Sequence, residues 1–245
     1  MADRAPGGVP ILSQGVVALV PMRHHSERVP GKNYRPLGGR PLYEHILTTL
    51  GACPEIEQIV VDTDSPVIRE GVSRDFPRVR LVERPDHLRG GEVSTNEVLL
   101  HDVEEVSGRF FLQTHSTNPL VTPATVSGAI RAFLQTYPQF DSLFTVTRLQ
   151  KRLWDRSGKP VNHDPAVLLR TQDLPPLFEE NSCLYIFERS VLLSRRSRLG
   201  ERPRMFEIAS FEAWDIDEEA DFEIAEALMQ SRSASRPGAV EKAAP

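Results

Sequence analysis

Cationic side chains crowd into one short stretch near the start of the chain, VPMRHHSERVPGKN, which covers residues 20–33. The stretch holds Arg23, Arg28 and Lys32, and Glu27 is its one carboxylate. Arginine can bind phosphate oxygens in a bidentate manner, and lysine acts on them as a point charge. These residue types indicate an anion-binding loop, although by themselves they leave open a solvated basic loop.

The spacing excludes two common phosphate-binding loops. No G-x-G-x-x-G is present, and a Walker A loop would need a glycine where Ser26 stands and a Ser or Thr where Asn33 stands. The chain also lacks H-E-x-x-H, C-x-x-C and G-x-S-x-G, so neither zinc hydrolysis nor Ser-triad chemistry has support. The histidines His24 and His25 could contact phosphate or acceptor, but they are interpreted as ordinary loop residues.

A second candidate for chemistry is the pair Asp215 and Asp217. In an extended segment, residues i and i+2 point to the same face, so both carboxylates share one side while Ile216 packs inward. Mg²⁺ takes one or two carboxylates together with phosphate oxygens and water. The alternative is that Asp217 caps the helix that follows it.

The elements that must position these residues follow from hydrophobic patterning. Near-continuous apolar runs, as expected for strands buried on both faces of a parallel sheet, occur at 16–20, 58–63, 79–82, 109–113, 142–147 and 183–187. Helical patterns occur at 41–51, 65–74, 94–106, 123–136 and 218–230. The alternation of strands and helices predicts an α/β fold, with a mainly parallel, doubly wound sheet and helices on both faces.

The 245 residues predict one domain at 15–230, with residues 1–14 and 231–245 as disordered ends. Residues 148–180 are irregular and are predicted to form an excursion from the sheet. The net charge of −5 argues against nucleic acid as a partner, and no apolar run has the roughly 20 residues of a membrane span. Without a signal-peptide pattern, and with Cys53 and Cys183 in no short motif, a cytoplasmic protein with reduced thiols is predicted.

A longer motif extends the opening stretch. Residues 21–42 fit P-x-R-x-x-S-x-x-x-P-x-K-N-x-R-P-L-x-G-x-P-L, which resembles the start of the CMP-sialic acid synthetase family, the acylneuraminate cytidylyltransferases. The likeness continues in order through VVDTDS (60–65), RPDHLRGGEVST (84–95), FLQ…NPL (111–120), LLRTQDLPPLFEENSCLYIF (168–187) and DIDEEADFEIAEAL (215–228). It spans about residues 15–230.

This resemblance implies a Rossmann-like nucleotide-diphospho-sugar transferase fold and a homodimer. The implied reaction joins CTP to an acidic acceptor, a 2-keto-3-deoxy sugar acid such as a sialic acid, and releases pyrophosphate. It implies Mg²⁺ or Mn²⁺, held by Asp215 and Asp217. Transfer of this kind depends mainly on positioning and on neutralising phosphate charge.

By family position, Arg23 and Lys32 neutralise triphosphate oxygens and are the implied catalytic residues. The implied nucleotide-binding set is Arg23, Ser26, Lys32, Asn33, Arg84 and Thr95. The implied acceptor-binding set is Gln113, Arg170, Gln172, Asn181 and Tyr185; an arginine with amides suits a carboxylate.

Three departures from the family pattern stand out. Glu92-Val93 replaces the usual Asp-Thr, Asn181-Ser182 replaces Asn-Gly, and QTHSTNPL is one residue longer than Q-P-T-S-P-L and carries His115. The last two fall on the acceptor side. They keep open a second acceptor, a small carboxylated phosphonate. A catalytically inactive nucleotide-binding module is a further alternative, against which the intact Lys32 and aspartates argue.

Overall fold

The computed structural model describes residues 14–234, and the predicted disordered ends fall largely outside them. A seven-stranded sheet has the order β5-β4-β1-β6-β8-β7-β9. Its strands are β1 (Val16–Met22), β4 (Ile56–Thr63), β5 (Arg80–Glu83), β6 (Phe110–Thr114), β7 (Ser142–Leu149), β8 (Leu177–Glu188) and β9 (Pro203–Glu207). Only β8 runs antiparallel to its neighbours among these strands, so the predicted mainly parallel sheet is confirmed.

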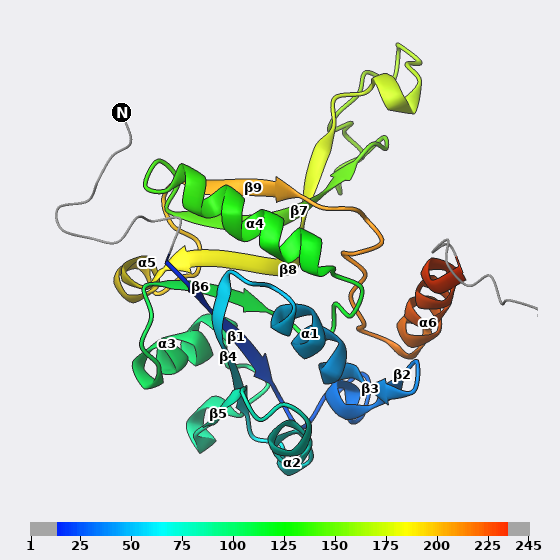
Figure 1. Ribbon diagram of the computed structural model, residues 1–245. Coiled ribbons are helices and arrows are strands. Elements are labelled where there is room, and N and C mark those ends of the chain that lie inside the picture. The colour runs from blue at the N-terminus through cyan, green and yellow to red at the C-terminus, as the bar shows by residue number, and fades with distance from the viewer. Residues whose placement is uncertain (1–13, 235–245) are drawn as a thin grey trace, which may run out of the picture.

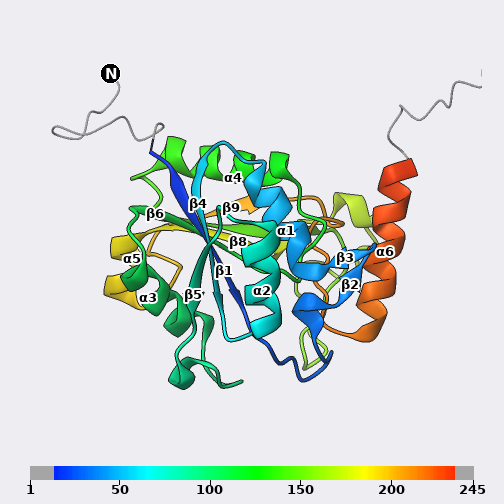
Figure 2. The ribbon, with the colours of Figure 1, turned by 60° about the horizontal axis from the view of Figure 1, so that its bottom comes forward.

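Helices cover both faces of the sheet (Figures 1 and 2). One face packs against α1 (Leu42–Gly51), α2 (Pro66–Asp75) and α4 (Pro123–Thr136), and the other against α3 (Thr95–Glu105) and α5 (Arg189–Arg195). Alternate residues of β1 explain the two layers, because Ala18 and Val20 enter the first cluster while Val17 and Leu19 enter the second.

A third, smaller cluster lies beside the sheet. The helix α6 (Glu219–Ala234) packs Phe222 and Ala225 against Val29, next to the short strands β2 (Pro36–Leu37) and β3 (Arg40–Pro41). Ile216, which the sequence placed inward, is fully buried in the same cluster. The cluster ties the basic loop to the segment that carries Asp215 and Asp217.

Most predicted elements agree with the observed ones, and the differences are local. The short strands β2 and β3 were not predicted, and β8 begins at Leu177 rather than at residue 183. The sequence patterns missed α5 and β9, which are only seven and five residues long. The first helix begins at Leu42, with Pro41 as its N-cap rather than in its first turn. The helix α6 continues to Ala234, past the end predicted for the domain at residue 230.

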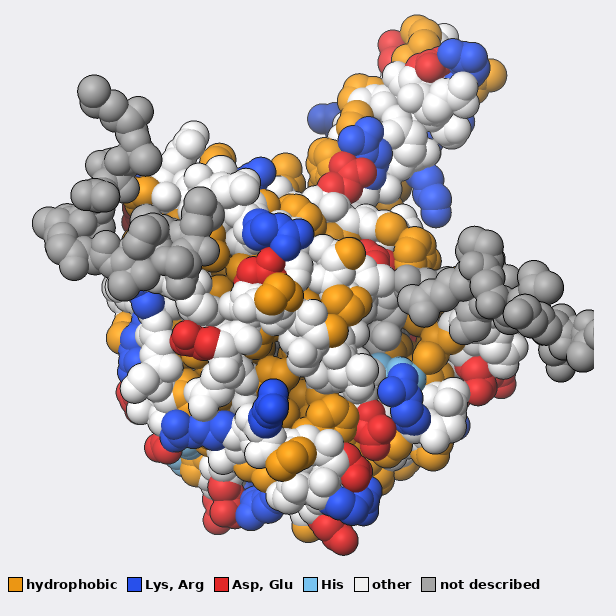
Figure 3. Space-filling model, in the orientation of Figure 1, with side chains coloured by type: hydrophobic (Ala, Val, Ile, Leu, Met, Phe, Trp, Pro, Cys, Tyr) orange, Lys and Arg blue, Asp and Glu red, His pale blue; other side chains and the backbone are white. Residues whose placement is uncertain are grey.

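Between β7 and β8 the chain leaves the sheet as an arm, residues 150–176, which holds one isolated β-bridge and a 3-10 turn. Figure 3 shows the arm standing clear of the body, with hydrophobic side chains on its surface. The side chains of Leu168 and Trp154 are 88% and 53% exposed. None of the helices in the described part of the chain combines the length and apolarity needed to cross a bilayer.

Candidate active site

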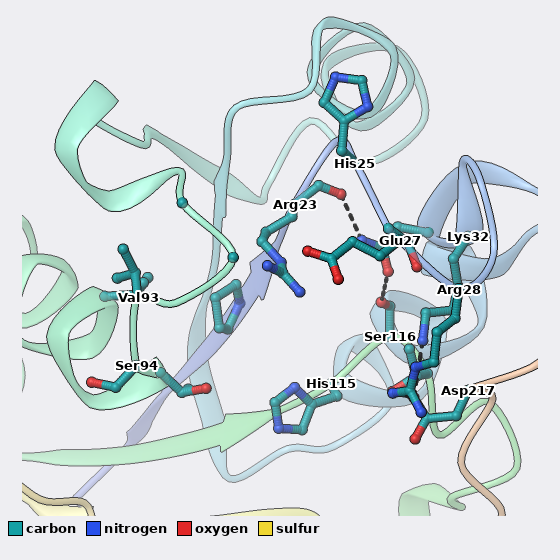
Figure 4. A pocket seen from close by; sticks show the side chains of 18 of the residues that line it. Arg23, His25, Glu27, Arg28, Lys32, Val93, Ser94, His115, Ser116 and Asp217 are labelled. Carbon is teal, nitrogen blue, oxygen red and sulfur yellow. Dashed lines mark hydrogen bonds and ion pairs between the residues drawn. The ribbon is translucent and has the colours of Figure 1, made fainter.

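A cavity of about 620 Å³ opens where the parallel strands end. Its walls come from the loop after β1, from Arg84 after β5, from the start of α3 and from His115–Thr117 after β6 (Figure 4). The chain order of the sheet reverses between β1 and β6, and ligands of open α/β sheets bind outside the carboxyl ends of strands at such points. The cavity therefore occupies the position that the topology favours.

The basic loop is held in shape by its own contacts. Gly31 has φ 68°, in the left-handed region, and opens a 3-10 turn at Lys32–Tyr34. Asn33 uses both ends of its amide, since Nδ2 donates to the Arg23 carbonyl at 2.7 Å and Oδ1 accepts from Ser116 Oγ at 2.7 Å (Figure 4). This brace leaves the exposed Arg23 side chain facing the cavity, while Asn33 itself acts as a support.

Lys32 and Asp217 form a pair at the cavity wall. The ammonium group donates to the Ile216 carbonyl at 2.7 Å and contacts Asp217 Oδ1 at 3.1 Å. Arg28 reaches the same oxygen at 2.6 Å. Burial opposes the charge on Asp217, but the hydrogen bond and charge of Lys32, with Arg28, outweigh it and lower the pKa of Asp217.

The capping alternative for Asp217 is wrong. The backbone N–H groups of Asp217 and Glu218 donate to Asp221 Oδ2 at 2.8 and 2.7 Å, so Asp221 caps the start of α6. The Asp217 carboxylate binds Lys32 and Arg28 instead.

The two aspartates line the cavity together, as predicted from their i, i+2 spacing. Burial and the charge of Asp217 raise the pKa of Asp215, the expected result when a carboxylate lacks a strong cation of its own. The described residues contain no group of three or more His, Cys, Asp or Glu side chains that could hold a metal alone. Two carboxylates facing a cavity that is also lined by Arg23 and Lys32 nevertheless fit Mg²⁺, which draws its other ligands from phosphate and water.

One side of the cavity, here called the α3 wall, is formed by Arg84 and residues 90–95. Ser94 caps α3 in a capping box with Glu97, so the positive end of the helix dipole lies at this wall. Arg84 is among the lining residues but is only 2% exposed, and its guanidinium forms an ion pair with fully buried Asp62.

A second buried acid stands behind that pair. Burial and the charge of Asp62 raise the pKa of Asp102 well above its ordinary value. Neither Asp102 oxygen, nor Asp62 Oδ2, has a conventional hydrogen-bond donor in the described part of the chain. A protonated Asp102 can donate its O–H to Asp62. Asp62 then remains ionised and forms the ion pair with Arg84.

The opposite side, here called the β6–β8 wall, presents His115 and Ser182 to the cavity. Gln113 and Tyr185 lie directly behind, at 0% and 1% exposure, on paired positions of β6 and β8. Arg198, from the segment after α5, packs over the Tyr185 ring with 3.5 Å between the guanidinium carbon and the ring centroid. It also donates to Gln113 Oε1.

Burial and the charges of Arg198 and Lys32 lower the pKa of His115 to about 4. The imidazole is therefore neutral at physiological pH. Ser182 has φ 57°, which explains why the family uses glycine there. Its hydroxyl contacts the Tyr185 hydroxyl at 3.2 Å.

A further cavity of about 800 Å³ adjoins the first and shares Ser182 and Asp215 with it. It lies between the base of the arm and residues 210–215. Two buried N–H donors of its lining residues, Asn181 Nδ2 and Trp214 Nε1, have no partner in residues 14–234. Buried donors without partners are costly, so this cavity is suited to a ligand rich in oxygen acceptors.

The structure brings most of the predicted site residues together. Lining the first cavity are Arg23, Ser26, Lys32, Asn33, Arg84, Thr95, Asp215 and Asp217. Asn181 lines the second cavity. Arg170 and Gln172 lie on the arm and line neither cavity; the Arg170 side chain is 72% exposed and pairs with Asp173 at 2.7 Å.

Several residues of the site had no assignment from the sequence, and four of them bind or support the charged groups of the walls. These are Arg28, which binds Asp217, and Asp62, Asp102 and Arg198, which lie behind the walls. Asp62 lies within the VVDTDS motif, and its position at the end of a buried strand was a usable signal. For Arg198 the sequence offers no signal, because it follows a short helix that the periodicity did not reveal.

Comparisons with known proteins agree with this geometry. The model of the family described as cytidylyltransferase matches residues 17–239. Among curated proteins, the chain is 23% identical to flagellin modification protein B of Campylobacter coli, over 89% of this chain and 96% of that protein. It is 25% identical to CMP-N,N'-diacetyllegionaminic acid synthase of Legionella pneumophila, over 88% and 96%.

Solved structures share the fold. A CMP:2-keto-3-deoxy-manno-octonic acid synthetase complexed with CTP superposes with TM-score 0.68 at 18% identity, covering 90% of this chain and 100% of that one. The 4-diphosphocytidyl-2C-methyl-D-erythritol synthase of Anaerococcus prevotii gives TM-score 0.66 at 12% identity, over 91% and 100%.

Proposed function

Because the chain belongs to the cytidylyltransferase family and is a CTP-dependent nucleotidyltransferase, we propose that its cavity transfers CMP from CTP to a small acidic acceptor and releases pyrophosphate. The observation that carries this proposal is the meeting of phosphate-binding cations and two carboxylates in one cavity. Lys32 stands at their junction, only 11% exposed and in contact with Asp217. A lysine held there can neutralise triphosphate oxygens next to a carboxylate-bound metal.

The nucleotide lies against the basic loop and the α3 wall. Arg23 and Lys32 neutralise the phosphates, Ser26 donates a hydroxyl, and Arg84 and Thr95 bind the nucleoside side. Asn33 contributes by holding the loop, as its two amide contacts require. The helix N-terminus adds a favourable field for the phosphates.

A divalent cation, Mg²⁺ or Mn²⁺, is held by Asp215 and Asp217. When bound it supplies charge for the triphosphate and the departing pyrophosphate. The residues of the chain do the rest. Lys32 keeps Asp217 ionised and positioned, and Arg28 shares the same carboxylate oxygen.

The acceptor lies at the β6–β8 wall and extends into the adjoining cavity. Asn181 and Trp214 offer their unpartnered N–H groups there. The acceptor class favoured by the relatives is a 2-keto-3-deoxy sugar acid, since one relative is named for legionaminic acid and another, from Acaryochloris marina, for 3-deoxy-manno-octulosonate. Tyr185 supports this wall from behind.

One observation favours a second candidate acceptor, a small carboxylated phosphonate such as phosphonoformate. Arg170 and Gln172, implied as acceptor ligands by the resemblance, lie on the arm outside both cavities. Without them, fewer side chains remain to bind a large sugar acid within one chain. A compact acceptor needs fewer contacts.

The arm suits a homodimer. Its exposed apolar side chains, including Leu168 at 88% exposure, are of the kind that mark protein interfaces. A second copy of the chain is the proposed partner. Sedimentation equilibrium should give twice the chain mass, and Leu168→Glu should shift the equilibrium toward monomer; a wild-type monomer at all concentrations would contradict the proposal.

Pyrophosphate release tests the function. The purified protein is given Mg²⁺ with CTP, ATP or GTP and with N-acetylneuraminic acid, other 2-keto-3-deoxy acids, phosphonoformate or a neutral sugar. We expect release with CTP and one acidic class. Turnover of sugar acids alone would refute the phosphonate candidate, turnover of phosphonates alone would refute the sugar-acid candidate, and no release at all would favour an inactive nucleotide-binding module.

A further inference from the structure

His115 lines the cavity and belongs to the longer QTHSTNPL segment, and the proposed transfer gives it no role. Figure 4 shows its ring reaching into the cavity, between the loop that carries Arg23 and the segment that carries Asp217. What a histidine can do there depends on which ring nitrogen bears the proton. The residues behind it determine that choice.

The contact with Arg198 fixes the orientation of the Gln113 amide. A guanidinium can only donate, so the Gln113 atom that it contacts must be the amide oxygen, Oε1. The other end of the amide, Nε2, faces the Thr114 carbonyl at 3.0 Å, which can only accept. Both contacts fix the same orientation of the Gln113 amide.

The remaining hydrogen of that amide points at His115. Gln113 Nε2 lies 3.0 Å from His115 Nε2, so the imidazole nitrogen must accept. A neutral imidazole that accepts at Nε2 carries its proton at Nδ1. His115 Nδ1 has no hydrogen-bond partner in the described part of the chain, although the ring lines the cavity.

We propose that His115 binds an oxyanion of the acceptor through Nδ1–H, and that Arg198 and Gln113 are positioning residues that hold its ring in this one tautomer. This assignment rests on the proposed cytidylyl transfer. The ligand chemistry is an anionic oxygen, of a carboxylate or phosphonate, because the cavity beside His115 also holds Lys32 and Arg23. A neutral, directed donor selects by position, whereas a further cation would bind any anion.

The alternative source of an oxyanion is the α-phosphate of CTP. The acceptor is favoured because His115 and its supports belong to the β6–β8 wall, with Ser182 and Tyr185, and not to the α3 wall. The two sources can be distinguished by substituting His115. If His115 binds the acceptor, the substitution changes the kinetic constants for the acceptor, and if it binds the α-phosphate, it changes those for CTP.

The first test is nitrogen-15 NMR of histidine-labelled protein at neutral pH, without substrates. The wild type should show His115 with a protonated Nδ1 and an unprotonated Nε2. Gln113→Glu removes the donor and places an acceptor before Nε2, so the proton should move to Nε2; Arg198→Lys, which keeps a donor to Gln113, should preserve the wild-type pattern. The opposite tautomer in the wild type would overturn the proposal that Arg198 and Gln113 fix the proton of His115 at Nδ1. This measurement needs no catalysis, so it remains valid if the proposed function fails.

The second test is kinetic, with N-acetylneuraminic acid and phosphonoformate as acceptors. His115→Leu should lower kcat/KM for the acceptor by about 10- to 100-fold, the range for a hydrogen bond to a charged group, and leave the KM for CTP within about threefold. Asn places its amide nitrogen near the position of Nδ1, so His115→Asn should retain more activity than His115→Gln, whose nitrogen lies nearer Nε2.

A matched control is His87→Asn, at an exposed histidine outside both cavities, which should behave as wild type. A loss confined to CTP would overturn the acceptor assignment. Equal activity of His115→Leu and wild type would overturn any binding role for His115.

Discussion

The two walls of the cavity bind by different physical means. The basic loop and the α3 wall present charge through Arg23, Lys32 and the positive end of α3, with Arg84 buried in its pair with Asp62. The β6–β8 wall presents neutral groups whose direction is fixed from behind by buried partners, such as Gln113. Strong charge suits a triphosphate, which is recognised mainly as an anion, and fixed direction suits the choice among small acids.

The largest expected effect is at Lys32, where the basic loop contacts Asp217. Lys32→Ala removes a charge from the transferring phosphates, so turnover should fall by about 10²–10³-fold. Stability should fall by only about 1 kcal/mol, because the side chain makes two polar contacts and packs little of the core. Initial rates of pyrophosphate release and thermal unfolding measure the two effects.

Lys159→Ala is the control, because Lys159 is exposed on the arm and lines neither cavity. Wild-type turnover by Lys32→Ala would remove Lys32 from the catalytic assignment.

The next effect is at the carboxylates between the walls. Asp215→Asn should weaken apparent Mg²⁺ affinity by at least about tenfold while the fold persists, since Asp215 lies at the cavity surface. Asp217→Asn should also impair activity, because it leaves Lys32 and Arg28 without their shared carboxylate. Magnesium titration of the rate measures both. Full activity in excess EDTA would exclude the metal role, and a silent Asp217→Asn would contradict its pairing with Lys32.

A smaller effect should appear behind the α3 wall, in the pH dependence of stability. The pKa of Asp102 is raised in the folded state, so its contribution is present at low pH and is lost as pH rises toward the folded pKa. From pH 5 to 8, wild type should therefore lose more unfolding free energy than Asp102→Asn does. Urea unfolding across this range measures the difference.

Exposed Glu104 on the same helix gives a matched control, since Glu104→Gln should keep the wild-type slope. Parallel slopes for wild type and Asp102→Asn would show that Asp102 is ionised in the folded protein.

The smallest effect is expected at Ser182, on the β6–β8 wall. Its left-handed φ of 57° disfavours any side chain, so Ser182→Gly should stabilise the protein by up to about 1 kcal/mol. Ser182 lines both cavities and its hydroxyl would be lost, so kcat/KM for the acceptor should fall modestly while the KM for CTP stays constant. A stability loss would mean that the contact with Tyr185 outweighs the backbone strain.

The sequence predicted the α3 wall and the basic loop better than the β6–β8 wall, and the reason is physical. Arg84 directly follows β5, and Lys32 and Asn33 lie in the loop that follows β1, so a local motif places each of them. Arg198 and Gln113 are 85 positions apart and meet only through the packing of a short helix that has too few residues for a periodic signal.

Arg170 shows that a matching sequence motif can also predict a position that the fold does not give. A motif match placed it with the acceptor, but β7 and β8 continue beyond the sheet as an arm and carry it away from the cavities of its own chain. The i, i+2 rule worked for Asp215 and Asp217 because backbone geometry alone determines it. Long-range packing follows no such local rule.

The most direct test of the proposed cytidylyl transfer is phosphorus-31 NMR of the reaction with CTP, Mg²⁺ and each acceptor of the panel, acidic or neutral. The account predicts one pyrophosphate released for each acceptor consumed, together with a new phosphorus signal from CMP joined to that acceptor. Release of CMP and pyrophosphate without a conjugate, or a conjugate formed only with a neutral sugar, would contradict it.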